Sequence, residues 1–277
     1  MTGDHREFAI PEFKPGYPTG GLDLEPDATG GLWIAMMYQG GLARFDKKAE
    51  SFQLFPVPAA LGNDATQQSM VMPAHADVDG KVWTNEVSRQ SLMRLDVATG
   101  AYELIDPFKN VPKSAAHTPY GMLADMDNNL WFMDFGDANI GKVDAKTLRT
   151  TLYPTPTQGS HPRRGQLVGE NIWFAEFGAD RIGMFNLVNE SMREWKVPTP
   201  WSFPYDVGID DLGNVWSGNM SNDRILRLRP ERGDGVEYLL PRSTNIRRVF
   251  VDNTTTPPSL WVGDNHGASI IHIEPLD

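Results

Sequence analysis

The chain has 277 residues, 40% of them hydrophobic, and a formal net charge of −11 at pH 7. The acidic balance argues against a nucleic-acid partner, which needs a basic surface to neutralise phosphates, and the lack of cysteine excludes disulfides, thiol catalysis and cysteine-ligated metals. No apolar run approaches the roughly 20 residues of a membrane span, and the polar N-terminus has no signal-peptide core, so we expect a cytoplasmic protein, or a periplasmic or secreted one whose signal peptide has been removed.

One tryptophan-containing pattern recurs six times along the chain. Its clearest copy is NIWFAEFGADRIG, at residues 171–183, and the six tryptophans follow one another at intervals of 50, 48, 42, 43 and 45 residues. They are Trp33, Trp83, Trp131, Trp173, Trp216 and Trp261. Repeats of this period are typical of architectures in which neighbouring units bury each other's faces. Since no flexible linker separates the copies, we expect a single domain over residues 1–277.

Each copy contains four short strand patterns separated by turn residues. In the middle copy they cover residues 119–125, 130–135, 140–144 and 150–153, and the last one stops at a proline. Four such patterns predict one antiparallel sheet. Six sheets of this kind predict an all-β fold, a six-bladed β-propeller with four-stranded antiparallel blades.

The two ends of the chain are expected to complete one blade together. The last copy ends after its third strand pattern, at residues 268–275, and the missing fourth pattern, EFAIPEF, stands at residues 7–13. We therefore expect residues 7–12 to pair with the last blade and close the ring. Two inserts, at residues 59–68 and 108–116, are predicted to be loops.

Carboxylates dominate the position three residues after each tryptophan, which should face the central channel. The six side chains are Met36, Glu86, Asp134, Glu176, Asn219 and Asp264. Four carboxylates at one narrow channel would repel one another unless a cation or an arginine lies among them. Because oxygen ligands suit Mg²⁺ or Ca²⁺, Glu86, Asp134, Glu176 and Asp264 are candidate metal ligands. Alternatively, each carboxylate accepts hydrogen bonds from its own loop or pairs with a local arginine.

A second set of polar residues lies where the first strand of a copy begins. The segments HTPYG, SHPRRG, SFPYD and TNIRR align Tyr120, Arg163, Tyr205 and Arg247 at one equivalent position. Arginine can bind a polar substrate group and tyrosine can transfer a proton, although these arginines could instead only neutralise the acids. The predicted substrate-binding residues are Arg163, Arg247, His117, His161 and Asn219. The predicted catalytic residues are His266, Tyr205 and Tyr120, with His266 favoured because its loop also carries Asp264.

The segments NIWFAEFGADRIGMF and REWKVPTP, together with NLWFMDFGDANIGKV and the PYD and PRRG motifs, resemble the virginiamycin B lyase (streptogramin lyase) family of propellers over almost the full chain. The resemblance implies an enzyme that opens a cyclic ester by Mg²⁺-assisted elimination. Members of that family carry catalytic histidines directly after the proline of the first strand, where this chain has Tyr120, Arg163 and Tyr205. They are usually seven-bladed, whereas six repeats are present here.

These observations predict a metal-assisted lyase that acts on a cyclic ester or another polar small molecule. In this hypothesis Mg²⁺ or Ca²⁺ polarises a carbonyl group, and His266 or a tyrosinate removes a proton. Two alternatives remain open: a metal-dependent lactone hydrolase that resembles gluconolactonase, and a propeller that binds a ligand or a protein without catalysis. We expect a small-molecule substrate, a monomer, and neither a nucleic-acid nor a membrane partner.

Overall fold

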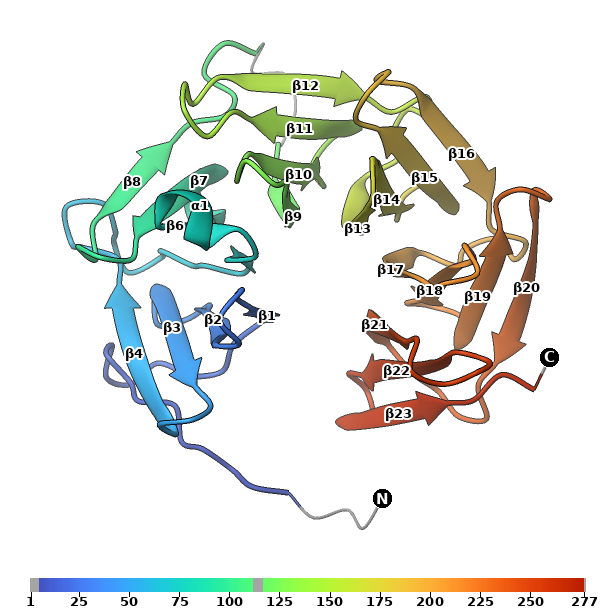
Figure 1. Ribbon diagram of the computed structural model, residues 1–277, viewed down its shortest axis with the longest axis horizontal. Coiled ribbons are helices and arrows are strands. Elements are labelled where there is room, and N and C mark those ends of the chain that lie inside the picture. The colour runs from blue at the N-terminus through green and yellow to red at the C-terminus, as the bar shows by residue number, and fades with distance from the viewer. Residues whose placement is uncertain (1–4, 112–116, 277) are drawn as a thin grey trace. The chain divides into compact units, whose positions relative to one another are not determined.

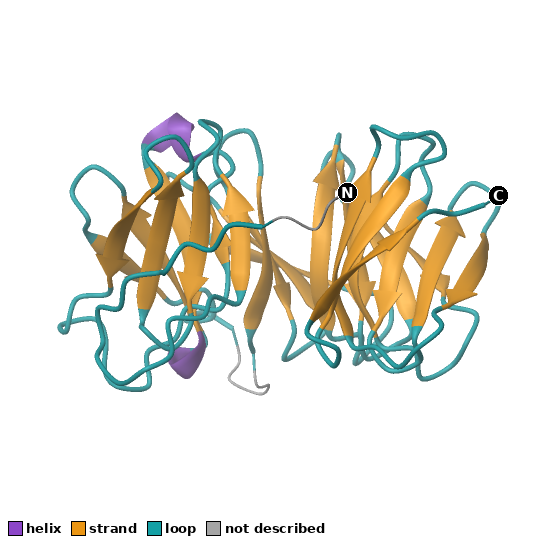
Figure 2. Cartoon of the chain, turned by 90° about the horizontal axis from the view of Figure 1, so that it is seen from below, coloured by secondary structure: helices purple, strands orange, loops and turns teal. Residues whose placement is uncertain are grey.

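The computed structural model describes residues 5–111 and 117–276, and nearly all its regular structure is antiparallel strand (Figure 1). The helices of the described residues are two short turns, α1 (Ala76–Asp79) and η1 (Val87–Arg89), drawn in purple in Figure 2. No helix among the residues described is long and apolar enough to cross a membrane. The predicted class is confirmed: the fold is an all-β, six-bladed β-propeller.

The six sheets follow the six sequence repeats. The first contains β1 (Asp23–Pro26), β2 (Leu32–Met36), β3 (Gly41–Asp46) and β4 (Ser51–Pro56), and the second contains β5 (Val71–Met72), β6 (Lys81–Glu86), β7 (Ser91–Asp96) and β8 (Tyr102–Ile105). The third contains β9 (Pro119–Ala124), β10 (Leu130–Asp134), β11 (Asn139–Val143) and β12 (Thr150–Pro154). The fourth contains β13 (Pro162–Val168), β14 (Asn171–Glu176), β15 (Arg181–Asn186) and β16 (Met192–Lys196). The fifth contains β17 (Pro204–Ile209), β18 (Val215–Asn219), β19 (Arg224–Arg229) and β20 (Asp234–Leu239), and the sixth contains β21 (Ile246–Asp252), β22 (Ser259–Asp264) and β23 (Ser269–Ile273).

The chain divides into two compact units. Unit 1 comprises residues 1–114, 118–131 and 142–151, and unit 2 comprises residues 115–117, 132–141 and 152–277. The first two sheets belong to unit 1, the last three belong to unit 2, and the strands of the third are divided between them. That residues 1–277 form one domain stays a prediction.

An aspartate six residues before the tryptophan organises the first turn of three repeats. Its carboxylate accepts backbone N–H groups of its own turn and also the indole N–H of the tryptophan that is the second residue of the next strand. The pairs are Asp27 with Trp33 (3.0 Å), Asp125 with Trp131 (3.0 Å) and Asp210 with Trp216 (2.8 Å). The tryptophans are therefore buried with their one polar atom satisfied, as a packed interior requires.

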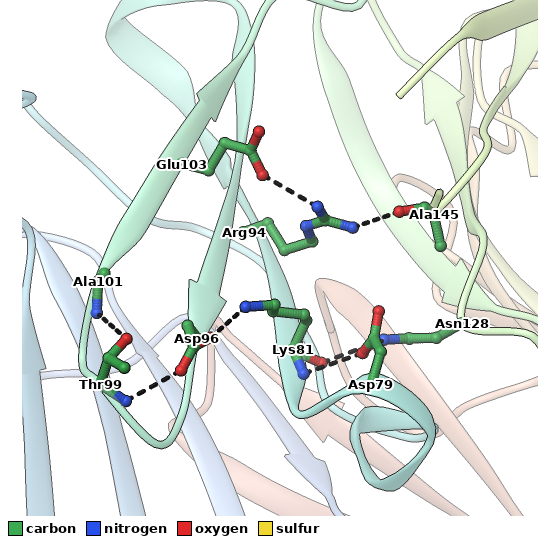
Figure 3. Close-up of polar contacts among 9 residues, drawn as sticks. All are labelled: Asp79, Lys81, Arg94, Asp96, Thr99, Ala101, Glu103, Asn128 and Ala145. Carbon is green, nitrogen blue, oxygen red and sulfur yellow. Dashed lines mark hydrogen bonds and ion pairs between the residues drawn. The ribbon is translucent and has the colours of Figure 1, made fainter. Parts of the chain in front are cut away.

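In unit 1, charged side chains tie the second sheet to the segment that follows β11 (Figure 3). Arg94 on β7 donates to the backbone carbonyl of Ala145 (2.6 Å) and to the carboxylate of Glu103 on β8 (3.0 Å). The Lys81 amine pairs with Asp96 across β6 and β7. The Arg94–Ala145 bond joins segments 51 residues apart in sequence, whereas the other two links join neighbouring strands of the second sheet.

The predicted pairing of residues 7–12 with the last blade is not confirmed. These residues form no strand, and the sixth sheet has three strands, β21 to β23. The segment instead packs on the first sheet: the Phe8 ring lies 4.8 Å from that of Phe45, and Arg6 donates two hydrogen bonds to Glu50, each of 2.7 Å. Aromatic packing and a bidentate ion pair thus hold the segment along β3, and ring closure stays a prediction.

The predicted inserts are loops as far as they are described. Residues 59–68 contain turns and no strand or helix, and residues 108–111 form a turn. Residues 112–116 of the second insert lie outside the described part of the chain.

Candidate functional site

The first strands of the last three sheets share an irregularity at one position. The register of β13 with β14 shifts between Pro162 and Gly165, that of β17 with β18 between Pro204 and Asp206, and that of β21 with β22 between Ile246 and Val249. Bulges redirect side chains and occur often beside active sites. The three bulges contain Arg163, Tyr205 and Arg247, which confirms the predicted equivalence of these positions. The fourth, Tyr120, is likewise the second residue of its strand, β9, and lies in unit 1.

Arg163 lies among three aromatic rings in unit 2. Its guanidinium carbon is 4.0 Å from the ring centre of Phe135, 4.1 Å from that of Tyr205 and 4.7 Å from that of Phe177. Tyr205 is only 2% exposed. Cation–π contacts of this kind are strongest where water is excluded. The three rings therefore hold a permanent positive charge in one orientation, and Arg247 lies farther out, 5.9 Å from the Tyr205 ring.

Non-glycine residues adopt left-handed backbone conformations directly before these strands. His161 (φ 46°), Trp201 (φ 60°) and Phe203 (φ 50°) lie in this region, which costs roughly 1–3 kcal/mol for each residue. The Asp180 carboxylate accepts the backbone N–H groups of residues 201, 202 and 203 at 2.7–3.0 Å. These bonds offset the strain. The Trp201 side chain is 73% exposed.

The protonation of the His161 ring follows from its hydrogen bond. Its Nδ1 lies 2.8 Å from the backbone carbonyl oxygen of Phe135. A carbonyl can only accept, so Nδ1 carries the hydrogen and the lone pair of the neutral ring is on Nε2. The ring also packs on Gly178, where a side-chain methyl would lie 2.6 Å from His161 Cδ2. His161 is therefore oriented by contacts on two sides, with a basic nitrogen at a half-buried position.

His117, Asp134 and Asp137, here called the His117 group, converge in unit 2. His117 Nδ1 lies 2.7 Å from Asp134 Oδ2 and 4.0 Å from Asp137 Oδ2. Asn139 donates weakly to both carboxylates, at 3.4 and 3.3 Å. The ligand atoms of the three residues all lie within 4.8 Å of one another, the only such set of His, Asp or Glu residues among those described. One imidazole and two carboxylates, with the Asp137 side chain 41% exposed, form a donor set that fits a divalent cation.

The structure gives the other predicted metal ligands local partners. Glu86, in unit 1, accepts hydrogen bonds from the Ser88 hydroxyl (2.8 Å) and from backbone N–H groups of its loop. Asp264 accepts the N–H groups of Asn245, His266 and Gly267, and these bonds, that of Gly267 first, lower its pKa. Internal satisfaction, the alternative interpretation of the acidic positions, thus describes Asp264, whereas the bonds to Glu86 all end on Oε1 and its buried Oε2 has no hydrogen-bond partner among the residues described.

Glu176 is fully buried beside another carboxyl group. Burial, and to a lesser extent the neighbouring Glu194, raise its pKa to about 8. Of the four acids predicted to hold a metal, only Asp134 belongs to the His117 group.

The remaining predicted residues occupy varied environments. Asn219 is fully buried and donates to Glu237 (3.2 Å), and Arg247 is exposed and donates to the Asn245 side chain (2.6 Å). His266 is exposed in the turn between β22 and β23.

Two aromatic residues of the candidate site were not predicted from the sequence. They are Phe135 and Phe177, and each directly follows an acid of the repeat, in the motifs DFG and EFG. That shared motif is the signal that could have identified them.

No protein-family model matches this sequence, and no curated protein matches it. Among solved structures, virginiamycin B lyase from Staphylococcus aureus is similar with a TM-score of 0.74 and 18% identity, over 94% of this chain and 85% of that one. A catalytically inactive form of that lyase with quinupristin gives 0.78 and 19%, over 98% and 86%. A putative 6-phosphogluconolactonase from Bacteroides fragilis gives 0.65 and 14%, over 91% and 79%. At such identities the likeness concerns the fold, and the chain has the β-propeller fold of the virginiamycin B lyases.

Proposed function

We propose that this protein is a lyase that opens a cyclic ester, or another small molecule with an ester group, by metal-assisted elimination. The observation that carries the proposal is the His117 group, which lies in the same unit as an oriented imidazole, His161, and a fixed guanidinium, Arg163. Phe135 connects them, because it follows Asp134 directly, accepts the hydrogen of His161 and places its ring against Arg163.

The residues divide the work of an elimination among them. The Nε2 atom of His161 would accept the proton from a carbon next to a carbonyl group, and the released electron pair forms a carbon–carbon double bond. The bond from the adjacent carbon to the ester oxygen then breaks, and a carboxylate leaves. The Arg163 guanidinium, charged at every physiological pH, would stabilise negative charge that develops on the substrate. Bound by the His117 group, a divalent cation would polarise the substrate carbonyl as a Lewis acid.

A lactone hydrolase is the second candidate, supported by the likeness to the putative 6-phosphogluconolactonase. The same residues could activate a water molecule instead of removing a substrate proton. The products separate the two reactions, because elimination leaves a conjugated double bond that absorbs in the ultraviolet and hydrolysis leaves a hydroxy acid. If the protein binds cyclic esters or lactones but forms no product from them, the remaining hypothesis is a propeller that binds a ligand without catalysis.

The proposal is tested first by thermal unfolding of chelator-treated protein with added Mg²⁺, Ca²⁺ or Mn²⁺. A metal at 100 times its Kd stabilises the folded state by about 2.7 kcal/mol, which raises the Tm of a chain of this size by about 5–10 °C. Asp137→Asn should abolish the rise without harming the fold, because this side chain is half exposed. The matched control is Asp211→Asn, an exposed aspartate in another turn of unit 2. An unchanged rise in the Asp137 variant, or no rise with any of the metals, would contradict the site.

A further inference from the structure

Two neighbouring sheets of unit 2 use the same tether to hold the segment that enters a first strand. In the fourth sheet, Glu194 on β16 accepts the backbone N–H (2.9 Å) and the hydroxyl (2.6 Å) of Thr157. In the fifth sheet, Glu237 on β20 accepts the same two groups of Thr199, at 3.1 and 2.6 Å. Thr157 and Thr199 stand at equivalent places, four residues before His161 and Phe203, which both adopt the left-handed conformation. The tethers therefore support the strained segments of the candidate site.

The residue that faces each glutamate differs between the two sheets. In the fifth sheet Asn219 donates its amide N–H to Glu237 Oε1 at 3.2 Å. At the same position of the fourth sheet stands Glu176, which has no hydrogen to donate when it is ionised. Glu237 therefore accepts a hydrogen bond from a neutral amide, whereas Glu194 has a second carboxyl group, that of Glu176, at the equivalent position.

The surroundings of Glu176 offer little compensation for a negative charge. The residue is 0% exposed, and neither of its carboxyl oxygens has a hydrogen-bond partner among the residues described. It lies over Gly183, where a methyl group would come within 2.8 Å of Oε1. The charged groups that act on it are Glu194 on β16 and Arg181 on β15, and the Arg181 Nε lies 3.7 Å from Glu194 rather than pairing with Glu176. A single arginine thus acts on two carboxyl groups, of which Glu176 is fully buried and Glu194 has 10% of its side chain exposed.

We propose that Glu176 and Glu194 share one proton, so that a neutral Glu176 carboxyl group takes the role that the Asn219 amide has in the next sheet. Two neighbouring carboxylates, one fully buried and the other with 10% of its side chain exposed, would repel each other and would be poorly hydrated. With the proton in place, Glu194 keeps its charge for Thr157 and Arg181. Burial and the charge of Glu194 raise the pKa of Glu176 to about 8, so the proton is retained at neutral pH and released under mildly alkaline conditions.

Loss of this proton is expected to loosen the segment that carries His161. The folded state binds a proton that the unfolded chain releases near its ordinary pKa of 4.5. The stabilisation is therefore complete below that pH, declines as pH rises and is lost once pH passes the folded pKa of about 8. The protonation of the pair thus controls how firmly Glu194 holds Thr157 through its two hydrogen bonds. This role does not depend on the proposed lyase activity.

The test is urea unfolding of the wild type and of Glu176→Gln at intervals from pH 6 to pH 9.5. Glutamine donates at every pH, so the unfolding equilibrium constants of the two proteins should diverge by up to tenfold per pH unit below pH 8 and run parallel above it. The reciprocal variant, Asn219→Asp, should acquire the same pH dependence at the fifth sheet. Parallel profiles of the wild type and Glu176→Gln across the whole range would overturn the proposal.

Two further measurements keep the proposal testable if the glutamine variant does not fold. Glu194→Gln removes the neighbouring charge and should move the alkaline loss of stability to lower pH; no movement would count against a shared proton. An infrared band of a protonated carboxyl group should be present at pH 6 and disappear above pH 8 in the wild type. If Mg²⁺ or Ca²⁺ removes the alkaline loss in the wild type, the pair holds a cation rather than a proton, and the proposal fails.

Discussion

The aspartate of the fifth sheet's first turn offers a quantitative test of how the repeat is stabilised. The Asp210 side chain is 3% exposed and accepts four hydrogen bonds. Two come from the backbone N–H groups of Leu212 (3.0 Å) and Asn214 (2.8 Å), one from the Asn214 amide (2.8 Å) and one from the Trp216 indole (2.8 Å). Asp210→Ala removes both acceptor oxygens and therefore all four hydrogen bonds.

The cost of Asp210→Ala is set mainly by the donor that stays buried. Trp216 is 1% exposed, and a buried donor without an acceptor costs about 1–3 kcal/mol. The N–H groups of the turn lie nearer the surface and can bond to water, so each should add about 0.5–1 kcal/mol. The sum is about 3 kcal/mol. For a chain of this size it corresponds to a Tm decrease of about 6–12 °C.

Thermal unfolding followed by circular dichroism measures the effect. Asp210→Asn keeps one carbonyl acceptor and should lose about half as much stability as the alanine variant. The neighbouring Asp211→Ala is the control, because its exposed side chain should matter by less than about 0.5 kcal/mol. A loss of less than 1 kcal/mol for Asp210→Ala, or equal losses at the two positions, would refute the claim that this carboxylate organises the turn.

Two further predictions concern the proposed base and the chain's N-terminus. His161→Gln should lower kcat by about 10²- to 10⁴-fold on any cyclic ester that the protein opens, the usual contribution of a general base, whereas His266→Gln should leave kcat nearly unchanged if the proposed base is correct. Deleting residues 1–12 should lower the Tm because the Phe8 contact and the Arg6 ion pair are lost. In the same deletion variant, faster backbone amide hydrogen exchange in β23 would support ring closure by residues 7–12. Unchanged exchange in β23 would indicate that residues 7–12 pack only on the first sheet.

Local patterns predicted the strands well, because their causes are local. Alternation of apolar and polar residues and the turn residues between them act within a few positions. The predicted third-copy strands at 130–135 and 140–144 therefore agree closely with β10 and β11. The equivalence of Arg163, Tyr205 and Arg247 could also be predicted, because each follows the start of a first strand at a fixed distance.

The partners of the acidic side chains could not be predicted in the same way. Asp134, Glu176 and Asp264 occupy one position of the repeat, yet they face an imidazole, a second carboxyl group and a set of backbone N–H groups, respectively. The strand pattern places the three residues alike, while loops and neighbouring strands of different sequence supply their partners. A search for four equivalent acids around one ion therefore missed the His117 group, which joins a strand end, its turn and the segment before β9.

The sequence by itself determined the number of sheets, the order of strands within the repeats and the residues that begin each first strand, since repetition and turn chemistry express these directly. Only the tertiary structure decided which acidic side chains have a perturbed pKa and which side chains lie together in the candidate site. The pKa of Glu176 is raised by burial and by Glu194 on another strand, and Arg163 packs against Phe135, Phe177 and Tyr205, which come from three different repeats. Electrostatic and cation–π energies depend on distances in space, and the folded backbone sets those distances.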